Sequence, residues 1–320
     1  MYSQFRHSIS SVRRSFLLAA VLLAIQPSHA APHSPQDPSA SLSHLTSQAE
    51  QGDPAAQYKL AQSFLRNNPS PGDYQSALKW LHSSAFQGYP DAQFLLGYLY
   101  EHGKGVHRDY ALAAENYRAA ALQHYSSAEN NLASLYQHGH GVPKNVAIAF
   151  EWYLASARHG NPVGQCNLAS LYFHGSGTPR DYNQAAKWFR ISANSGWPEA
   201  QDDLAYLYYK GLGVPLDYSE AARLFRLAAQ KGLPNSQTSL AYLYEVGKGV
   251  PLDYVAAYTW YSRALAAGDH LGSARLTRLA GIMTRKQIDE ANSLLSASSS
   301  QPQPLPSSPA IGSFSLIGDH

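Results

Sequence analysis

Histidines recur at one position of this sequence in a pattern that could bind a metal ion. His102, His138 and His174 are spaced 36 residues apart, and His140 follows His138 by two residues. Zinc binds imidazole nitrogens at about 2.0–2.1 Å, whereas equivalent atoms of packed helices would lie roughly 10 Å apart. Only His138 and His140 could therefore chelate together. The alternative is that these histidines interact with helix C-termini, where cationic groups are favoured, and we expect no bound metal.

Two side chains could act as nucleophiles. Ser76 and Lys79 have the S-x-x-K spacing of penicillin-interacting serine enzymes, but the S-D-N and K-T-G motifs of that set are absent from the sequence. Cys166 is the single cysteine, and no base can be assigned to it. No pair of carboxylates can be argued to converge. We therefore expect a protein that is not an enzyme and that uses no cofactor.

A glycine-rich segment could hold a phosphate. The hexapeptide GVPLDY occurs at Gly213–Tyr218 and at Gly249–Tyr254, which start 249 − 213 = 36 residues apart. A phosphate loop needs a preceding strand and a dedicated lysine, and neither is present. A turn fits better, because glycine can end one helix in the left-handed conformation and aspartate can cap the next. The expected caps are Asp73, Asp109, Asn145, Asp181, Asp217 and Asp253.

The elements that carry these residues are repeats. Glycines recur every 36 residues, and His124 stands at the one missing position. Register kept without insertion or deletion predicts a repeat architecture. In each unit, one apolar stripe at helical spacing precedes the glycine turn and a second follows it. We therefore expect two short helices per unit, here called helix A and helix B. The glycines that recur at this interval, here called the glycine ladder, are Gly52, Gly88, Gly160, Gly196, Gly232 and Gly268.

The second unit carries a specific pattern, which is repeated in phase along residues 45–295. Its matching residues are Ala92, Gln93, Leu96, Gly97, Tyr100, Gly103, Gly105, Val106, Asp109, Ala113, Tyr117, Ala120 and Ala121. The pattern resembles the Sel-1-like repeat, a relative of the tetratricopeptide repeat. The resemblance implies an all-α, right-handed α/α solenoid of six 36-residue helix-turn-helix repeats that binds proteins or peptides. A capping half-repeat, residues 270–283, and a final helix to about Leu295 are expected to close it.

The remaining segments predict export and flexible ends. Residues 1–30 combine a basic segment, a ten-residue apolar run and small residues before the expected cleavage after Ala30, as in a secretory signal peptide. That run is too short for a membrane span, which needs roughly 20 residues. Residues 31–44 are expected to be a flexible linker, and residues 296–320 a disordered Ser/Pro-rich tail. The chain is therefore expected to be periplasmic or secreted.

The charge balance argues against nucleic-acid and membrane-surface binding. The chain has 24 lysines and arginines and 22 acidic residues, a net charge of +2. Removal of the three leader arginines, Arg6, Arg13 and Arg14, gives 2 − 3 = −1. A nearly neutral chain lacks the basic footprint that nucleic acid requires. We expect a monomer with a protein or peptide partner.

Comparison of the six units separates two kinds of position. Positions filled alike are expected to form the core, such as the leucine of helix A and the aromatic pair of helix B. Three variable positions of helix A, at 94, 98 and 101 in unit two, share one face. By analogy with related solenoids, this face lines a concave groove. The expected groove residues are Phe94, Tyr98, Glu101, Phe173, Asp202, Tyr206, Tyr209 and Tyr242.

Tyr98, Phe173, Tyr206, Tyr209 and Tyr242 are expected to be exposed or half-exposed in this groove, as interface anchors often are. The alternative is that these aromatic residues only fill space between neighbouring A helices. The sequence accordingly favours an exported scaffold or adaptor. Two other functions stay open, namely a cell-wall-directed enzyme or ligand-binding protein of the penicillin-interacting type, and a secreted effector.

Overall fold

A computed structural model describes residues 38–298, and this part of the chain forms helices and contains no strand. The chain divides into two units, residues 1–44 and 45–320, and the second unit contains the repeats. The expected signal peptide, residues 1–30, and tail residues 299–320 lie outside the described part. Among the residues described, no helix has the length and apolar character needed to cross a membrane.

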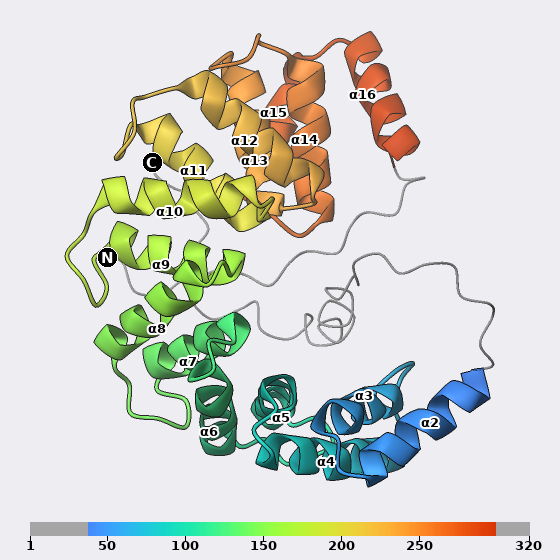
Figure 1. Ribbon diagram of the computed structural model, residues 1–320. Coiled ribbons are helices and arrows are strands. Elements are labelled where there is room, and N and C mark those ends of the chain that lie inside the picture. The colour runs from blue at the N-terminus through green and yellow to red at the C-terminus, as the bar shows by residue number, and fades with distance from the viewer. Residues whose placement is uncertain (1–37, 299–320) are drawn as a thin grey trace, which may run out of the picture. The chain divides into compact units, whose positions relative to one another are not determined.

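Six consecutive helix pairs follow the predicted 36-residue interval, and each helix packs against the next one along the chain (Figure 1). This arrangement confirms the predicted all-α solenoid of six repeats. The pairs are α3 (Pro54–Phe64) with α4 (Pro71–Phe86), α5 (Pro90–His102) with α6 (Tyr110–Ala121), α7 (Ser126–His138) with α8 (Val146–Arg158), α9 (Pro162–His174) with α10 (Tyr182–Asn194), α11 (Pro198–Lys210) with α12 (Tyr218–Gln230), and α13 (Pro234–Val246) with α14 (Tyr254–Ala266).

Additional helices flank the six pairs. Helix α2 (Pro38–Glu50) begins inside the range 31–44, so the expectation of a flexible linker is wrong for residues 38–44. After the last pair, α15 (Ser273–Ile282) and α16 (Arg285–Ser298) both contact α14. The start of α16 has a reciprocal cap, because the Thr284 amide donates to Gln287 Oε1 at 2.9 Å and the Gln287 amide donates to Thr284 Oγ1 at 3.3 Å. These two helices match the expected C-terminal closure. Helix α16 extends three residues beyond Leu295, so the expectation of a disordered tail is wrong for residues 296–298.

The turns inside the repeats have the predicted caps. In repeats two to six, helix A ends at a glycine with a positive φ between 63° and 74°. The Asp or Asn before helix B then accepts hydrogen bonds from amides of the first turn, such as Ala111 and Leu112 at Asp109. Repeat one differs, because Ser70 is the cap and Asp73 occupies the third helical position of a capping box. The hydrogen bonds from Ser70 lower the pKa of Asp73.

The second glycine of each turn has a different task, which is contact between neighbouring repeats. A β-carbon at Gly213 would lie 2.2 Å from the Tyr182 carbonyl oxygen, and one at Gly249 would lie 2.0 Å from the Tyr218 carbonyl oxygen. Tyr182 and Tyr218 begin helix B of the preceding repeat. The turn of one repeat therefore rests directly on the backbone of the repeat before it, so only glycine fits without a shift in structure.

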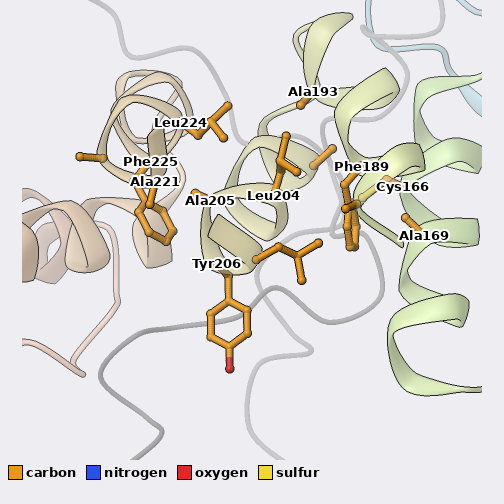
Figure 2. Close-up of a cluster of buried hydrophobic side chains, with 14 of the residues drawn as sticks. Cys166, Ala169, Phe189, Ala193, Leu204, Ala205, Tyr206, Ala221, Leu224 and Phe225 are labelled. Carbon is orange, nitrogen blue, oxygen red and sulfur yellow. The ribbon is translucent and has the colours of Figure 1, made fainter. Parts of the chain in front are cut away.

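The core consists of the positions that are filled alike in every repeat. Figure 2 shows part of it in repeats four and five, where Phe189 and Phe225 lie among leucine and alanine side chains. The corresponding helix B residues Tyr117, Tyr153 and Tyr261 are also at most 1% exposed. The tryptophans beside them are half-buried at the edge of this core: Trp80, Trp152, Trp188 and Trp260.

Candidate functional site

The first variable position of helix A joins neighbouring repeats and does not face a partner. Phe94 is 8% exposed, and its ring stacks at a centroid distance of 5.0 Å on Tyr125, which directly precedes helix α7 of the following repeat. Asp202 is fully buried and accepts a hydrogen bond from Ser236. The expectation that Phe94 and Asp202 line an open groove is therefore wrong, because both side chains are used in packing between repeats.

The third variable position changes together with the buried aromatic residue of helix B. Where helix B carries tyrosine, helix A supplies a hydrogen-bond acceptor. Tyr117 donates to Glu101 at 2.6 Å, and Tyr153 donates to Gln137 at 3.0 Å. The last repeat has the same arrangement, with 2.7 Å between Tyr261 Oη and Glu245. A buried hydroxyl needs such a partner, so Glu101 has a structural role that the sequence reading missed.

Repeats four and five lack this hydroxyl and carry no carboxylate or amide at the paired position of helix A. Phe189 and Phe225 replace tyrosine in helix B, and helix A carries Phe173 and Tyr209 at the paired position. Phe173 and Tyr209 pack against the core but stay half-buried. The exchange of a polar pair for an aromatic pair therefore leaves large aromatic side chains partly open to solvent in these two repeats.

The second variable position divides into buried and half-buried tyrosines. Tyr98 is 5% exposed and Tyr206 is 9% exposed, so the expectation that they are open anchors is wrong. The ring of Tyr98 stacks on His102 at 4.2 Å, and its hydroxyl accepts a hydrogen bond from Lys104 at 3.2 Å. Tyr242 is half-buried as expected, and the Arg275 guanidinium lies 4.8 Å from its ring centre.

A continuous set of half-buried aromatic side chains and lysines remains on repeats four to six, and we call it the aromatic–lysine strip. Its members are Phe173, Tyr182, Tyr209, Lys210, Tyr218, Tyr242 and Lys248. The ring centres of Phe173 and Tyr182 are 5.3 Å apart, and those of Tyr209 and Tyr218 are 5.2 Å apart. Lys248 Nζ lies 5.0 Å from the Tyr218 ring centre. Such distances allow cation–π attraction.

The strip also includes residues that the sequence reading did not select. Tyr182 and Tyr218 directly follow the capping aspartates, where five of the six repeats carry tyrosine. The recurrence of tyrosine at this position was the signal in the sequence that could have identified Tyr182 and Tyr218. Lys210 Nζ lies 5.6 Å from the Tyr206 ring centre and 5.7 Å from that of Tyr209, so it lies close to both of these tyrosines of repeat five. Burial, with a smaller contribution from Tyr242, raises the pKa of Tyr209. The strip can therefore offer neutral hydroxyl groups, apolar ring faces and positive charge.

The candidate nucleophiles have no arrangement for catalysis in the described residues. Cys166 is fully buried, and burial together with the nearby Asp203 raises the pKa of its thiol well above the usual value. A protonated and inaccessible thiol is a poor nucleophile. Lys79 is exposed and lies 5.1 Å from the centre of the Trp80 ring. These observations favour structural roles for both groups.

Two of the recurring histidines match the helix-terminus interpretation. The Nδ1 atoms of His102 and His138 lie 2.9 Å from the carbonyl oxygens four residues earlier, Tyr98 and Ser134. The ring of His140 stacks against that of His138 at 5.6 Å and against Tyr110 at 4.8 Å. The side chains of His102 and His138 therefore contact the last turn of their own A helices, α5 and α7.

A different histidine cluster lies where repeats two and three meet, and the sequence reading missed it. His124, Glu129 and His159 place one possible ligand atom each within 4.8 Å of the others. His159 Nδ1 is 2.9 Å from both carboxylate oxygens of Glu129. The signal in the sequence was that His124 and Glu129 replace the glycine and the glutamine found in the other repeats.

Repeat five contains a buried acidic group of a different kind. Asp202 and Asp203 are at most 1% exposed, and Glu199 is 2% exposed. Burial raises the pKa of Asp202 from 3.8 to about 7, although the hydrogen bond from Ser236 opposes the shift. Since these carboxyl groups are inaccessible to a substrate, we interpret them as part of the packing between repeats.

An open depression with a volume of about 910 Å³ lies on repeats one and two. Its lining includes His82, Gln87 and Glu115, and none of the expected groove residues. His82 is engaged there with the Tyr100 hydroxyl, 3.3 Å from its Nε2 atom.

Comparison with known families identifies the repeats. Six consecutive segments match the Sel1 repeat, at residues 54–89, 90–125, 126–161, 162–197, 198–233 and 234–269. These segments cover more than half of the chain and coincide with the six helix pairs. A comparison with curated proteins found no match.

Solved structures agree with the repeat assignment. A protective antigen present in uropathogenic Escherichia coli strains, described as displaying an SLR fold, is 32% identical, with a TM-score of 0.72. The match covers 81% of this chain but only 56% of the antigen. A Sel1 repeat protein from Oxalobacter formigenes is 28% identical, with a TM-score of 0.64, and the match covers 77% of this chain and 98% of that protein.

Proposed function

Because the chain belongs to the Sel1 repeat family, we propose that it is an exported scaffold that binds a protein or peptide through the face of its A helices. Sel1 repeat proteins generally serve as scaffolds for protein interactions. The binding surface in this proposal is the aromatic–lysine strip of repeats four to six. The observation that carries it is that Phe173, Tyr209 and Tyr242 stay half-buried, whereas Tyr98 and Tyr206 are used in packing.

The chemistry of the strip specifies the partner. Half-buried aromatic rings with polar tips are typical anchors of protein interfaces. Lys210 and Lys248 add positive charge beside the rings of Tyr209 and Tyr218. A complementary segment would carry apolar side chains together with aspartate or glutamate. The proposed partner is therefore an acidic protein segment with apolar anchors.

The cellular place of this function follows from the leader. The basic segment, apolar run and small residues of positions 1–30 support export from the cytoplasm. The proposed site of action is the periplasm or the extracellular space. Binding without catalysis is also part of the proposal, and the buried thiol of Cys166 supports it.

A capture experiment with charge-reversal variants tests the proposal. The bait is the full chain, and one variant carries Lys210→Glu with Lys248→Glu. The matched control carries Lys59→Glu with Arg66→Glu, two exposed cations of repeat one. Circular dichroism first verifies that all three baits are equally helical.

We expect the native bait and the control to retain the same protein from the exported fraction, and the strip variant to lose it. Charge reversal removes the attraction for an acidic partner without opening the core. Retention of that protein by the strip variant at the native level would contradict the assignment of the binding surface. Retention of no protein by any bait would contradict the scaffold function itself.

A further inference from the structure

Three departures from the repeat pattern meet at one place where repeats two and three join. His124 stands where the glycine ladder has its one interruption, and Glu129 stands where the other five repeats carry glutamine. His159 occupies the position at which the two preceding repeats carry Gln87 and Gln123. All three replacements introduce metal-binding side chains, and their ligand atoms lie within 4.8 Å of one another.

The repeats without these replacements show what glutamine does at the position of Glu129. Gln93 donates from Nε2 to the Ala85 carbonyl oxygen at 3.2 Å, and its Oε1 accepts from Gln123 at 2.8 Å. The same pair of bonds occurs at Gln57, with 3.0 Å to Ala49 and 2.9 Å from Gln87. An amide can both donate and accept, so glutamine ties two helices together.

Glu129 cannot reproduce this pair of bonds. An ionised carboxylate accepts hydrogen bonds but donates none, so the bond to the carbonyl oxygen eight residues earlier is lost. Glu129 is nevertheless 1% exposed, and both of its oxygens face His159 Nδ1 at 2.9 Å. The position has therefore exchanged a structural amide for two buried carboxyl oxygens that face an imidazole.

His124 is also unfavourable as a purely structural residue. Its φ is 62°, in the left-handed region that glycine adopts without penalty and other residues rarely adopt. At the equivalent Gly88 and Gly160, a β-carbon would meet nothing within 4 Å, so the added carbon itself gains no packing contact. The His124 ring instead lies 4.8 Å from the His159 ring. A ligand shared with His159 explains a histidine at this strained position.

We propose that His124, Glu129 and His159 form a binding site for a divalent transition metal ion, with Zn²⁺ as the ion that fits best. Two imidazoles and one carboxylate are a known zinc ligand set that leaves a fourth position for water or a further ligand. Ligand atoms around tetrahedral zinc are separated by about 3.3 Å. The two histidines are exposed and can close from 4.8 Å to that spacing by side-chain rotation.

Zinc titration of the metal-free full chain by calorimetry tests the site, with Co²⁺ absorption as a second measurement. The variants restore the residues of the other repeats: His124→Gly, Glu129→Gln and His159→Gln. They are expected to fold, because glycine and glutamine occupy these positions in neighbouring repeats. The matched control is His138→Gln with His140→Gln, which removes two histidines from the same repeat.

We expect one Zn²⁺ per chain, binding at least 10-fold weaker in each restoring variant, and native affinity in the control. Co²⁺ should give the visible absorption of a low-symmetry site only with the native chain and the control. Zinc should raise the unfolding temperature of these two proteins and not that of the restoring variants. Equal zinc affinity in the native chain and the restoring variants, or no binding by the native chain, would overturn the proposal.

Discussion

At the scale of single residues, the hydroxyl groups buried at the centre of repeats two, three and six govern what the neighbouring helix carries. Tyr117, Tyr153 and Tyr261 are at most 1% exposed, and each donates to an acceptor sixteen residues earlier. Leaving such an acceptor without its donor costs about 1–3 kcal/mol. The tyrosine donor of helix B and its acceptor on helix A therefore change together from one repeat to another.

Removal of one hydroxyl should measure this coupling. Tyr117→Phe leaves the Glu101 carboxylate without its donor, so we expect a loss of about 1–3 kcal/mol in the free energy of unfolding. Phe225→Tyr is the matched change in repeat five, where Tyr209 stands at the paired position and no acidic acceptor is present. Urea unfolding checks both variants. Unchanged stability of Tyr117→Phe would contradict the account of the pair.

A second residue-scale prediction concerns pH. Burial raises the pKa of Asp202 to about 7, whereas the unfolded chain has the ordinary value of 3.8. Between these values the folded state holds a proton that the unfolded state releases, so the contribution of Asp202 to stability falls as pH rises. The difference corresponds to roughly 4 kcal/mol.

Asp202→Asn tests this prediction, because the amide keeps an acceptor for Ser236 and does not ionise. The free energy of unfolding of the native chain, relative to that of the variant, should fall between about pH 4 and about pH 7. Glu199, Asp203 and Asp269 are the other acids at this place and are unchanged in the variant. Parallel pH profiles of the two proteins would show that Asp202 titrates normally.

At the scale of elements, the sequence predicted the helices and their caps well because both depend on local chemistry. Proline, glycine and aspartate fix where each helix begins and ends. The burial of Tyr98 and Tyr206 could not be read in this way, because it depends on contacts such as that between Phe173 and Tyr206 across two repeats. The metal-ligand cluster was missed for the same reason, since it joins residues of two adjacent repeats.

A comparison of a glycine between two repeats with the second glycine of a turn inside a repeat provides an element-scale prediction. Gly160 has a φ of 81°, and a β-carbon added there would meet no atom within 4 Å, so Gly160→Ala should cost about 1–2 kcal/mol from backbone strain alone. Gly213→Ala adds a collision with the Tyr182 carbonyl at 2.2 Å, and we expect at least twice that loss. Urea unfolding of the two variants measures both losses in the free energy of unfolding. Equal losses would show that the second glycine has no role in repeat contact.

At the scale of the whole molecule, each repeat contacts mainly its neighbours, so the ends of the stack need protection. Helix α15 provides it at the C-terminal side through arginines bound to a buried acid. Glu245 is 4% exposed and is held by Arg278 and by Arg275, whose Nη1 lies 3.3 Å from Oε2. Uncompensated burial of that carboxylate would be costly.

Loss of this closure should act locally. With Arg275→Ala and Arg278→Ala together, we expect faster amide exchange in α13 to α16 and unchanged exchange in α3 to α6, because disorder spreads from the damaged end of a repeat stack. Hydrogen-exchange mass spectrometry provides the measurement. Uniform acceleration along all repeats would indicate that the solenoid opens as one cooperative unit.

The most direct test of the central claim is site-specific photo-crosslinking in cells that express the full chain. A photoreactive phenylalanine analogue replaces Tyr209 or Tyr242 in the aromatic–lysine strip, or Phe86, which is 94% exposed on repeat one. The scaffold account predicts that one exported protein is crosslinked from positions 209 and 242 and not from position 86. Crosslinking of that partner from position 86 alone, or no crosslinked protein from the strip, would contradict it.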